Sequence, residues 1–469
     1  MTAIRMIKRQ KRAHKAEKIL YLCVMSKENE IELIYGRAMF LMAKPVGAMC
    51  NLRCNYCYYL EKRGLYEGSA QVMSDETLER FIKEYIAAQT TPEVLFIWHG
   101  GEPLLRSIAF YERVMELQER YADGKHIDNC IQTNGTLINE AWCEFFREHN
   151  FLVGVSIDGT REMHDALRTT PQGGSSFKDV IRGIDLLNRY GVEWNAMATV
   201  NAANVEHPLE FYRFFRDELE CRYLQFTPVV ERTAPDGRLL HGAEVGGTVT
   251  PHSITAKQWG EFLCTIFDEW VRHDVGHIFV QLFDATLANW VGAPVGVCTM
   301  SKYCGGAAAI EHNGDLYACD HFVFPEYRLG NIHTDSLLDM MYGAKQRAFG
   351  EAKYKSLPSK CRKCRYEFAC HGECPRNRFA TTSDGEQGLN YLCDGYYALF
   401  EHAHEAMDYM RMQLEKGAAP ANVMNWLKRR ETLYEDKTAI HTIAIWRPTN
   451  PLDGGTGTGA SKHHRYHVR

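Results

Sequence analysis

The sequence predicts an α/β fold built on a parallel sheet, followed by a smaller cysteine-rich region. Between about residues 40 and 265, short apolar runs alternate with amphipathic runs, and repeated strand–helix units are typical of a parallel barrel or open barrel. From about 275 to 400 the chain is rich in cysteine and punctuated by glycine. The chemically distinctive residues come directly after the predicted strands, as in barrels whose chemistry gathers at the carboxyl ends of the strands.

Strand and helix candidates alternate along the first region. After a first strand that ends before Cys50, the runs expected as strands are Val94–Trp98, Asn129–Thr133, Leu152–Ile157, Glu193–Val200 and Tyr223–Phe226. The runs expected as helices are Thr77–Ala88, Phe110–Tyr121, Glu140–Glu148, Phe177–Tyr190 and Pro208–Glu218. Ser74 or Asp75 is a suitable N-cap for the first of these helices.

The second region is expected to contain a β-hairpin over 309–319, because Asn313-Gly314 is a favoured two-residue turn. Residues 396–437 have a helical pattern, and the Gly- and Thr-rich segment from about 448 has the composition of a disordered tail. We therefore divide the chain into a disordered N-terminal extension, a barrel domain, a cysteine-rich domain with C-terminal helices, and a flexible tail. These parts cover residues 1–38, 39–270, 271–437 and 438–469.

Charge and hydropathy exclude several classes of function. The net charge of -5 gives no basic footprint for nucleic acid, and no run of about twenty apolar residues predicts a membrane span. Basic residues precede a short apolar run at 19–25, a superficial likeness to a signal peptide, but charged residues come next and no small-residue cleavage site is present. We expect a disordered extension, with Met39 as an alternative start of translation.

The 16 cysteines indicate a reducing, cytoplasmic location and metal ligation rather than disulfides, because no export signal is present. Three lie at 50–57 and eight lie between 298 and 393. The other five are isolated, as is usual for small buried apolar side chains. These are Cys23, Cys130, Cys143, Cys221 and Cys264.

The first cysteine group has the spacing CxxxCxxC, with Cys50, Cys54 and Cys57, and Tyr56 stands just before the last cysteine. Three thiolates suit three corners of a [4Fe-4S] cube and leave the fourth iron without a protein ligand. The amino and carboxylate groups of S-adenosylmethionine (SAM) can chelate such an iron. The alternative is a structural zinc site that lacks one ligand, since soft thiolates also select zinc.

A glycine-rich turn, Gly100-Gly101-Glu102-Pro103, comes after the next predicted strand. Two glycines let a backbone approach a ligand closely, and the exposed carbonyls and Glu102 could hold a cationic amino group. Alone, such a sequence is more often only a turn. Its position at the strand end next to the cysteine group makes it informative.

Eight cysteines form two interleaved groups in the second region. One group begins with Cys298 and Cys304 and continues with Cys319 after the hairpin turn. The other contains Cys361, Cys364, Cys370, Cys374 and Cys393. Eight thiolates suffice for two four-thiolate sites, which are either iron–sulfur clusters or zinc ions that hold a small domain together.

Together these motifs resemble the radical SAM enzymes with a SPASM-type auxiliary-cluster domain, and more narrowly the anaerobic sulfatase-maturating enzymes. The similarity covers about residues 43–397. Its most specific stretches are Cys50–Lys62, Trp98–Pro103, Leu224–Arg232, Tyr317–Asp320 and Cys361–Arg378. The resemblance implies a partial (β/α)6 TIM-like barrel followed by a SPASM-type α+β domain, with three [4Fe-4S] clusters and SAM as cofactors.

The resemblance also implies a role for individual residues. Cys50, Cys54 and Cys57 would bind the catalytic cluster, Cys298, Cys304, Cys319 and Cys374 the first auxiliary cluster, and Cys361, Cys364, Cys370 and Cys393 the second. The implied SAM contacts are Tyr56, Gly101, Ser156, Arg168 and Val230. Asp320 would be the general base, although the hairpin sequence alone would suggest a solvated carboxylate.

Such an enzyme is expected to convert a cysteine or serine of a sulfatase to Cα-formylglycine under anaerobic conditions. In this hypothesis SAM supplies a 5′-deoxyadenosyl radical that takes a hydrogen atom from Cβ, Asp320 takes the thiol or hydroxyl proton, and the leftover electron enters the first auxiliary cluster. The implied partners are a Cys/Ser-x-Pro-x-Arg-like segment of the sulfatase and a flavodoxin- or ferredoxin-type reductant, without nucleic acid or membrane.

Two other functions stand as alternatives. Another SPASM-type enzyme could form thioethers or carbon–carbon crosslinks in a peptide, but such enzymes often carry an N-terminal peptide-binding domain of about eighty residues, and 1–38 are too few. A non-catalytic electron carrier needs no small-molecule site. The open iron and the Gly-Gly turn therefore argue against a carrier.

Overall fold

The computed structural model describes residues 39–66, 71–241, 244 and 246–432 of the 469-residue chain. The predicted extension 1–38 and the predicted tail 438–469 lie outside the described residues. The chain divides into two units, 1–423 and 424–469, and the sheets and the candidate site belong to the first. No helix within the described ranges is both long and apolar enough to cross a membrane.

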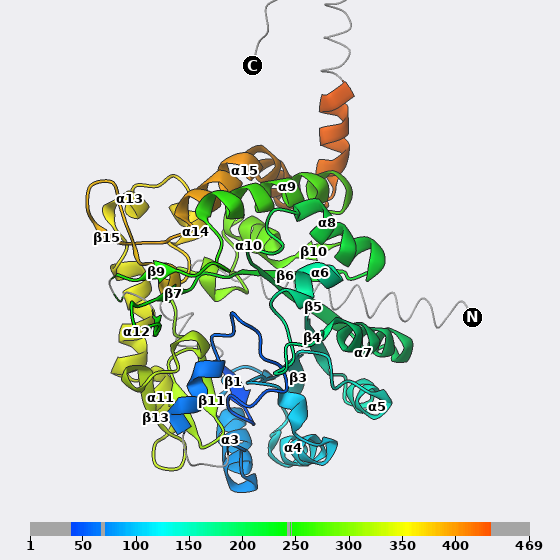
Figure 1. The fold of residues 1–469 in the computed structure, drawn as a ribbon, viewed down its shortest axis with the longest axis vertical. Coiled ribbons are helices and arrows are strands. Elements are labelled where there is room, and N and C mark those ends of the chain that lie inside the picture. Colours follow the sequence, from blue (N-terminus) through cyan, green and yellow to red (C-terminus); the bar gives the residue numbers. More distant parts are fainter. Residues whose placement is uncertain (1–38, 67–70, 242–243, 245, 433–469) are drawn as a thin grey trace, which may run out of the picture. The chain divides into compact units, whose positions relative to one another are not determined.

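Six parallel strands form the centre of the molecule, as the strand–helix alternation predicts (Figure 1). Each pairs with its neighbours in chain order, from β1 at one side to β6 at the other. They are β1 (Phe40–Lys44), β2 (Glu93–Trp98), β3 (His126–Thr133), β4 (Leu152–Ser156), β5 (Trp194–Val200) and β6 (Tyr223–Pro228). The α/β class and the parallel barrel sheet are confirmed, with strand bounds that differ from the predicted ones by a few residues.

Helices connect these strands and pack along the outer side of the sheet (Figure 1). They are α3 (Asp75–Ala88), α4 (Ile108–Tyr121), α5 (Glu140–Glu148), α6 (Arg161–Asp165), α7 (Phe177–Tyr190) and α8 (Pro208–Arg213). The Ser74 hydroxyl caps α3 by accepting from Thr77 N–H at 3.1 Å. The predicted helical stretch 208–218 is helical throughout, and its second half widens into a π-helical turn, Phe214–Glu218.

The cysteine-rich region continues the same sheet at both of its edges. Strand β10 (Phe279–Val280) pairs in parallel with β6, and β11 (Ala307–Glu311) pairs in parallel with β1. Strands β12 (Asp315–Tyr317) and β13 (Arg328–Asn331) then add in antiparallel fashion. Strands β11 and β12 form the predicted hairpin, and its turn needs glycine because Gly314 has a φ of +86°.

The remaining elements cover the sheet and surround the later cysteines. Short strands β7 (Arg232–Thr233), β8 (Leu239–Leu240) and β9 (Thr248–Val249) form one small sheet, and β14 (Ala380–Thr381) and β15 (Gln387–Leu389) form another. The helices are α9 (Ala256–His273), α10 (Gln281–Trp290), α11 (Leu337–Tyr342), α12 (Ala344–Lys355), α13 (Ser359–Arg362), α14 (Glu367–Cys370) and α15 (Cys393–Glu415). The helical pattern predicted for 396–437 is thus divided: α15 ends at Glu415, and a separate helix covers 422–432.

Helices α9 and α15 lie side by side and cross closely (Figure 1). Gly260 and Gly395 meet at the crossing, where a Cβ on Gly395 would lie 2.3 Å from the Ala256 carbonyl oxygen. Helix α15 begins at Cys393. The close crossing therefore fixes the position of the last cysteine of the second region.

Strand β2 shows how burial directs side chains toward the site. Val94, Phe96 and Trp98 are buried, and Phe96 and Trp98 contact Phe81 of α3 edge-on. Successive side chains of a strand point to opposite faces. His99, the next residue, therefore belongs to the inner face of the sheet, where it meets the end of β1.

Candidate active site

The loop after β1 carries the first three cysteines at the carboxyl end of the sheet. Leu52 N–H donates to Cys50 Sγ at 3.4 Å, the Asn134 amide donates to the same sulfur at 3.8 Å, and Arg168 Nη1 lies 3.9 Å from Cys54 Sγ. Burial, with a contribution from the neighbouring Cys57, raises the pKa of Cys50 to about 11 and that of Cys54 to about 12. Three adjacent sulfurs that accept hydrogen bonds are a suitable ligand set for an iron–sulfur cluster, whose binding favours the thiolate form.

The glycine turn after β2 packs directly against this loop. Gly101 N–H donates to the Gly47 carbonyl and Glu102 N–H to the Met49 carbonyl, each at 2.8 Å. A Cβ on Gly101 would lie 1.9 Å from the Met49 carbonyl oxygen, so another residue would displace the loop. The second glycine is therefore required because two backbones touch just ahead of Cys50.

The carboxylate of Glu102 is turned inward, so of the groups predicted to hold an amino group the backbone carbonyls of the turn remain as candidates. The carboxylate is completely buried and accepts hydrogen bonds from Leu104 N–H at 2.9 Å, Asn134 N–H at 2.8 Å and the Thr133 hydroxyl at 2.7 Å. Burial raises the pKa of Glu102 to about 7. Glu102 instead ties the end of β2 to the end of β3.

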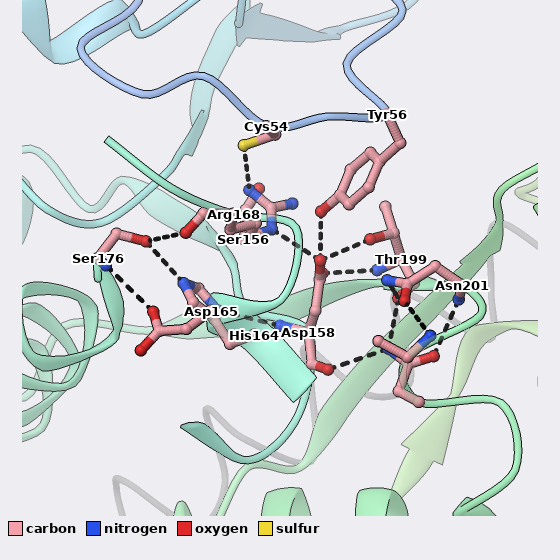
Figure 2. Close-up of polar contacts among 12 residues, drawn as sticks. Cys54, Tyr56, Ser156, Asp158, His164, Asp165, Arg168, Ser176, Thr199 and Asn201 are labelled. Atoms are coloured by element: carbon pink, nitrogen blue, oxygen red, sulfur yellow. Dashed lines mark hydrogen bonds and ion pairs between the residues drawn. The ribbon is translucent and has the colours of Figure 1, made fainter. Parts of the chain in front are cut away.

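A second network, around Asp158, connects the cysteine loop to the strand ends of β4 and β5 (Figure 2). The Asp158 carboxylate is completely buried and accepts from Thr199 N–H at 2.9 Å, from the Thr199 hydroxyl at 2.7 Å and from the Tyr56 hydroxyl. Arg168 Nε lies 3.0 Å from the same carboxylate. The guanidinium group is thereby held next to Cys54, with its centre 5.6 Å from the Tyr56 ring centroid.

His164 and Ser176 hold the turn that presents Arg168 (Figure 2). His164 Nδ1 accepts from Asp158 N–H at 3.4 Å, so the ring proton is on Nε2, which donates to the Ser176 hydroxyl at 2.9 Å. Ser176 in turn donates to the Arg168 carbonyl at 2.8 Å. Burial lowers the pKa of His164 to about 4, in agreement with a neutral ring.

The five SAM contacts expected from the sequence all lie at the carboxyl end of the sheet. Tyr56 and Arg168 belong to the Asp158 network, and Gly101 packs against the cysteine loop. Ser156 ends β4, and its hydroxyl accepts from Gln132 Nε2 at 3.0 Å. Val230 comes after β6 and lines a small hollow together with Tyr58, Glu231 and Arg376.

The electrostatic neighbours of the later cysteines are other cysteines of the same region. Burial raises the pKa of Cys319, and Cys298, Cys374 and Cys304 raise it further. Burial likewise raises the pKa of Cys393 to about 11, with contributions from Cys361 and Cys364, and that of Cys370 to about 12, with contributions from Cys393 and Cys361. Within the described ranges, no three His, Cys, Asp or Glu side chains converge on the position of a single metal ion. The thiolates of a cluster bind different irons and need not converge in that way.

Asp320 lies at the start of a short 3₁₀ turn (Asp320–Phe322), directly after Cys319. One carboxylate oxygen pairs with the Lys44 ammonium group and the other accepts from the Tyr58 hydroxyl. Burial alone would raise the pKa of Asp320, but Lys44, with contributions from His99 and His321, lowers it well below its usual range. Asp320 is therefore an ionised, buried carboxylate beside the first auxiliary cysteine group, and the expectation of a solvated hairpin side chain is wrong.

The sequence analysis assigned no role to Lys44, Tyr58, Asp158 or Thr199. Lys44 is the last residue of β1, so the strand-end rule that selected the Gly-Gly turn could also have selected Lys44. Tyr58 comes directly after Cys57. Thr199 lies inside a predicted strand, and no sequence signal separates its role from ordinary burial.

The fold and the site define a radical SAM enzyme with a further iron–sulfur domain. Residues 45–215 match the model of the Radical SAM superfamily, and residues 298–365 match the model of an iron–sulfur cluster-binding (SPASM) domain. The enzyme therefore uses a [4Fe-4S] cluster with SAM, together with auxiliary iron–sulfur clusters.

Comparison with individual proteins narrows this class to one family. The chain is 57% identical to a serine-type anaerobic sulfatase-maturating enzyme of Bacteroides thetaiotaomicron over 84% of the chain and 96% of that relative. It is 31% identical to a cysteine-type enzyme of Clostridium perfringens, over 77% of the chain and 95% of that relative. The structure of native anSMEcpe with bound AdoMet and Cp18Cys peptide matches with a TM-score of 0.71 at 31% identity, over 80% of the chain and 99% of that structure. The chain belongs to the anaerobic sulfatase-maturating enzymes, which generate formylglycine.

Proposed function

We propose that this enzyme oxidises a serine in a Ser-x-Pro-x-Arg-like segment of a sulfatase to Cα-formylglycine, and that Asp320 takes the hydroxyl proton. The preference for serine is supported by 57% identity to the serine-type relative against 31% to the cysteine-type relative. The anSMEcpe structure has a peptide bound together with AdoMet, which supports a polypeptide substrate here. A cysteine substrate would pass through a thioaldehyde that hydrolyses to the same product.

The groups of cysteines support a set of three [4Fe-4S] clusters, each held by one group. In this proposal Cys50, Cys54 and Cys57 hold the cluster that binds SAM, which supplies a carbon radical able to abstract hydrogen from Cβ. Cys298, Cys304, Cys319 and Cys374 hold the first auxiliary cluster, and Cys361, Cys364, Cys370 and Cys393 hold the second. Residues 39–270 then form the catalytic barrel and 271–437 the auxiliary region. A flavodoxin- or ferredoxin-type protein in the cytoplasm would supply electrons.

The SAM-binding side chains in this proposal are those grouped around the first thiolates. Arg168 and Tyr56 would contact SAM from the Asp158 network, with Gly101, Ser156 and Val230 completing the site. Arg168 is suited to this role because its guanidinium group lies beside Cys54 and is fixed by a fully buried carboxylate. The dense hydrogen bonding of Asp158 makes the site rigid before SAM arrives, which lowers the cost of ordering on binding.

The observation that carries the assignment of Asp320 is its position. It is a buried carboxylate directly next to Cys319, and its two oxygens contact Lys44 and the Tyr58 hydroxyl. An ionised carboxylate can accept a proton without first losing one, and the substrate proton becomes more acidic once a radical forms on the adjacent carbon. Asp320, the proposed proton acceptor, therefore directly follows Cys319, a proposed ligand of the first auxiliary cluster that would accept the electron.

The test compares two peptides that differ only in serine or cysteine at the target position. Reconstituted enzyme, SAM and dithionite are incubated anaerobically, and peptide mass and 5′-deoxyadenosine are measured. A loss of about 2 Da from the serine peptide, or about 18 Da from the cysteine peptide, is the mass change of aldehyde formation by this cofactor chemistry. A faster serine reaction supports the proposal. A faster reaction of the cysteine peptide would contradict the proposed preference for serine. Formation of 5′-deoxyadenosine without a mass change in either peptide would show that a sulfatase segment is not the substrate.

A further inference from the structure

Lys44 is a buried cation at the reaction site to which no role has been given. It ends β1, lies between β2 and β11 in the sheet, and is completely excluded from solvent. A buried ammonium group is costly unless it is paired and hydrogen-bonded. The partners of Lys44 therefore indicate why it is there.

Three groups surround the Lys44 ammonium. The first is Asp320, the only carboxylate of the described residues that pairs with Lys44. Glu311 is the neighbour of Lys44 in the paired strand, but its carboxylate accepts from the Tyr59 hydroxyl instead. The second is the Tyr59 ring, whose centroid lies 4.4 Å from Lys44 Nζ.

The third group is His99, and its tautomer fixes the direction of the contact. Gly100 N–H donates to His99 Nδ1 at 2.7 Å, so Nδ1 carries a lone pair. Lys44 Nζ lies 3.3 Å from the same nitrogen and must therefore be the donor. The ammonium group thus directs one proton to His99 and another to Asp320, while the Tyr59 ring covers it from a third side. Lys44 has a single defined orientation as a result.

We propose that Lys44 is a positioning residue for proton transfer, which holds the Asp320 carboxylate aimed at the substrate hydroxyl. In this step the substrate O–H bond breaks and an O–H bond forms on Asp320. Lys44 keeps its own protons throughout, and the electron leaves separately toward the auxiliary clusters. The inference rests on the assignment of Asp320 as the proton acceptor in the proposed function.

The geometry of Asp320 explains why such positioning matters. Lys44 and Tyr58 each occupy one oxygen of the carboxylate, and a carboxylate has about four acceptor sites, so acceptor capacity remains for the substrate. Without Lys44 the carboxylate keeps only the Tyr58 contact and can turn about its own side-chain bonds. Small misplacement of a catalytic group lowers the rate strongly even when the group itself is present.

The experiment uses the holoenzyme and the variants Lys44→Met, Lys44→Arg, Asp320→Asn and the double variant Lys44→Met/Asp320→Asn. Lys62→Met is the matched control, because Lys62 is a second buried lysine that pairs with Glu61 at 2.8 Å rather than with Asp320. Iron content, SAM cleavage, KM for the peptide and the ratio of formylglycine to 5′-deoxyadenosine are measured for each. The ratio reports proton transfer after radical formation, which a general loss of structure would not change selectively.

Lys44→Met is expected to retain iron and SAM cleavage and to leave KM for the peptide unchanged. It should lower the product ratio by at least about tenfold, a smaller loss than the roughly 10² to 10⁴ expected when the base itself is removed. Lys44→Arg retains the charge and is expected to restore most of the ratio, and Lys62→Met is expected to match the unmodified enzyme. In the Asp320→Asn background the second substitution should have no further effect, because Lys44 acts through Asp320.

Equal loss of iron, SAM cleavage and product in both Lys44 single variants would show a purely structural role and overturn the proposal. If Lys44→Met alone fails to bind its clusters, the double variant Lys44→Met/Asp320→Asn still tests the proposal, because it leaves no unpaired buried charge. A ratio equal to that of Asp320→Asn supports the proposal, and a further tenfold loss contradicts it. Failure of the proposed function is recognised separately, because the unmodified enzyme would then oxidise neither peptide, or Asp320→Asn would retain the full product ratio.

Discussion

Two buried ion pairs lie at the carboxyl end of the same sheet, and their carboxylates are bound very differently. Asp158 is fully buried and accepts from Tyr56, from the Thr199 hydroxyl and N–H, and from Arg168. Among the described residues, the partners of Asp320 are Lys44 and Tyr58, and Asp320 remains 9% exposed. Carboxylates offer about four acceptor sites. The first carboxylate is therefore saturated and rigid, whereas the second can still accept a proton.

The difference between the two carboxylates corresponds to two tasks of the proposed active site, the cleavage of SAM and the oxidation of the substrate. In the proposed function, the Arg168–Asp158 pair fixes the groups around Cys54 that bind and cleave SAM. The Lys44–Asp320 pair lies beside Cys319, where the substrate would lose its proton and electron. Substitutions near the first pair should therefore change SAM cleavage, and substitutions near the second should change the later oxidation of the substrate.

The largest expected effect comes from removing the cluster that both tasks require. Cys54→Ala should abolish 5′-deoxyadenosine formation, because the SAM-binding cluster loses one of its three thiolates. The auxiliary clusters should remain, since their cysteines lie in separate groups of the chain. Iron analysis and electron paramagnetic resonance of the reduced variant measure both outcomes. Continued SAM cleavage would contradict the assignment of the first cysteine group.

Asp320→Asn is expected to separate the two tasks most clearly. SAM cleavage should persist while formylglycine formation falls by about 10² to 10⁴, the usual contribution of a positioned acid or base. The asparagine has nearly the same shape but cannot accept the proton as a carboxylate does. Deoxyadenosine and peptide mass, measured in the same reaction, give the result. Full product formation would remove Asp320 from the mechanism.

Asp158→Asn is expected to weaken the binding of SAM and to leave the later oxidation of the substrate unchanged. It leaves Arg168 as a buried charge without its partner, and breaking such a pair costs about 3–5 kcal/mol. Thermal unfolding under anaerobic conditions should therefore begin at a lower temperature, and SAM should bind more weakly. Each SAM molecule that is still cleaved should yield as much formylglycine as in the unmodified enzyme, so the formylglycine-to-deoxyadenosine ratio should stay unchanged. A lower ratio with normal SAM affinity would show that the two pairs are not separate in function.

The sequence predicted most of the fold because apolar periodicity reports burial locally. The bounds of α5 and α7 agree with the predicted Glu140–Glu148 and Phe177–Tyr190, and the Asn313-Gly314 turn specifies its hairpin. The cysteine spacing indicated the cluster groups for a similar reason, since the ligands of each motif lie close together in the sequence. The identity of the family was predictable from these local motifs.

Long-range pairing was not predictable in the same way. A lysine is ordinarily exposed, and Lys44 is buried only because Asp320, on a hairpin far along the chain, comes to the end of β1. Glu102 looked like a ligand-binding carboxylate, yet Thr133 and Asn134 at the end of β3 supply donors that turn it inward. In both cases the deciding partner lies on another strand or just beyond it, which composition and spacing do not reveal.

The smallest effects come from a matched pair of substitutions, each of which removes one hydroxyl donor from one carboxylate. Thr199→Val leaves the backbone donor to Asp158 in place, and Tyr58→Phe leaves the ring that packs against His321. A single hydrogen bond contributes about 1 kcal/mol, or roughly fivefold in a rate or binding constant. Thr199→Val should raise KM for SAM by that factor with an unchanged product ratio, whereas Tyr58→Phe should lower the product ratio with an unchanged KM for SAM. The Thr199 hydroxyl contacts Asp158, and the Tyr58 hydroxyl contacts Asp320. A lower product ratio in Thr199→Val, or a higher KM for SAM in Tyr58→Phe, would therefore contradict the separate functions of the two ion pairs.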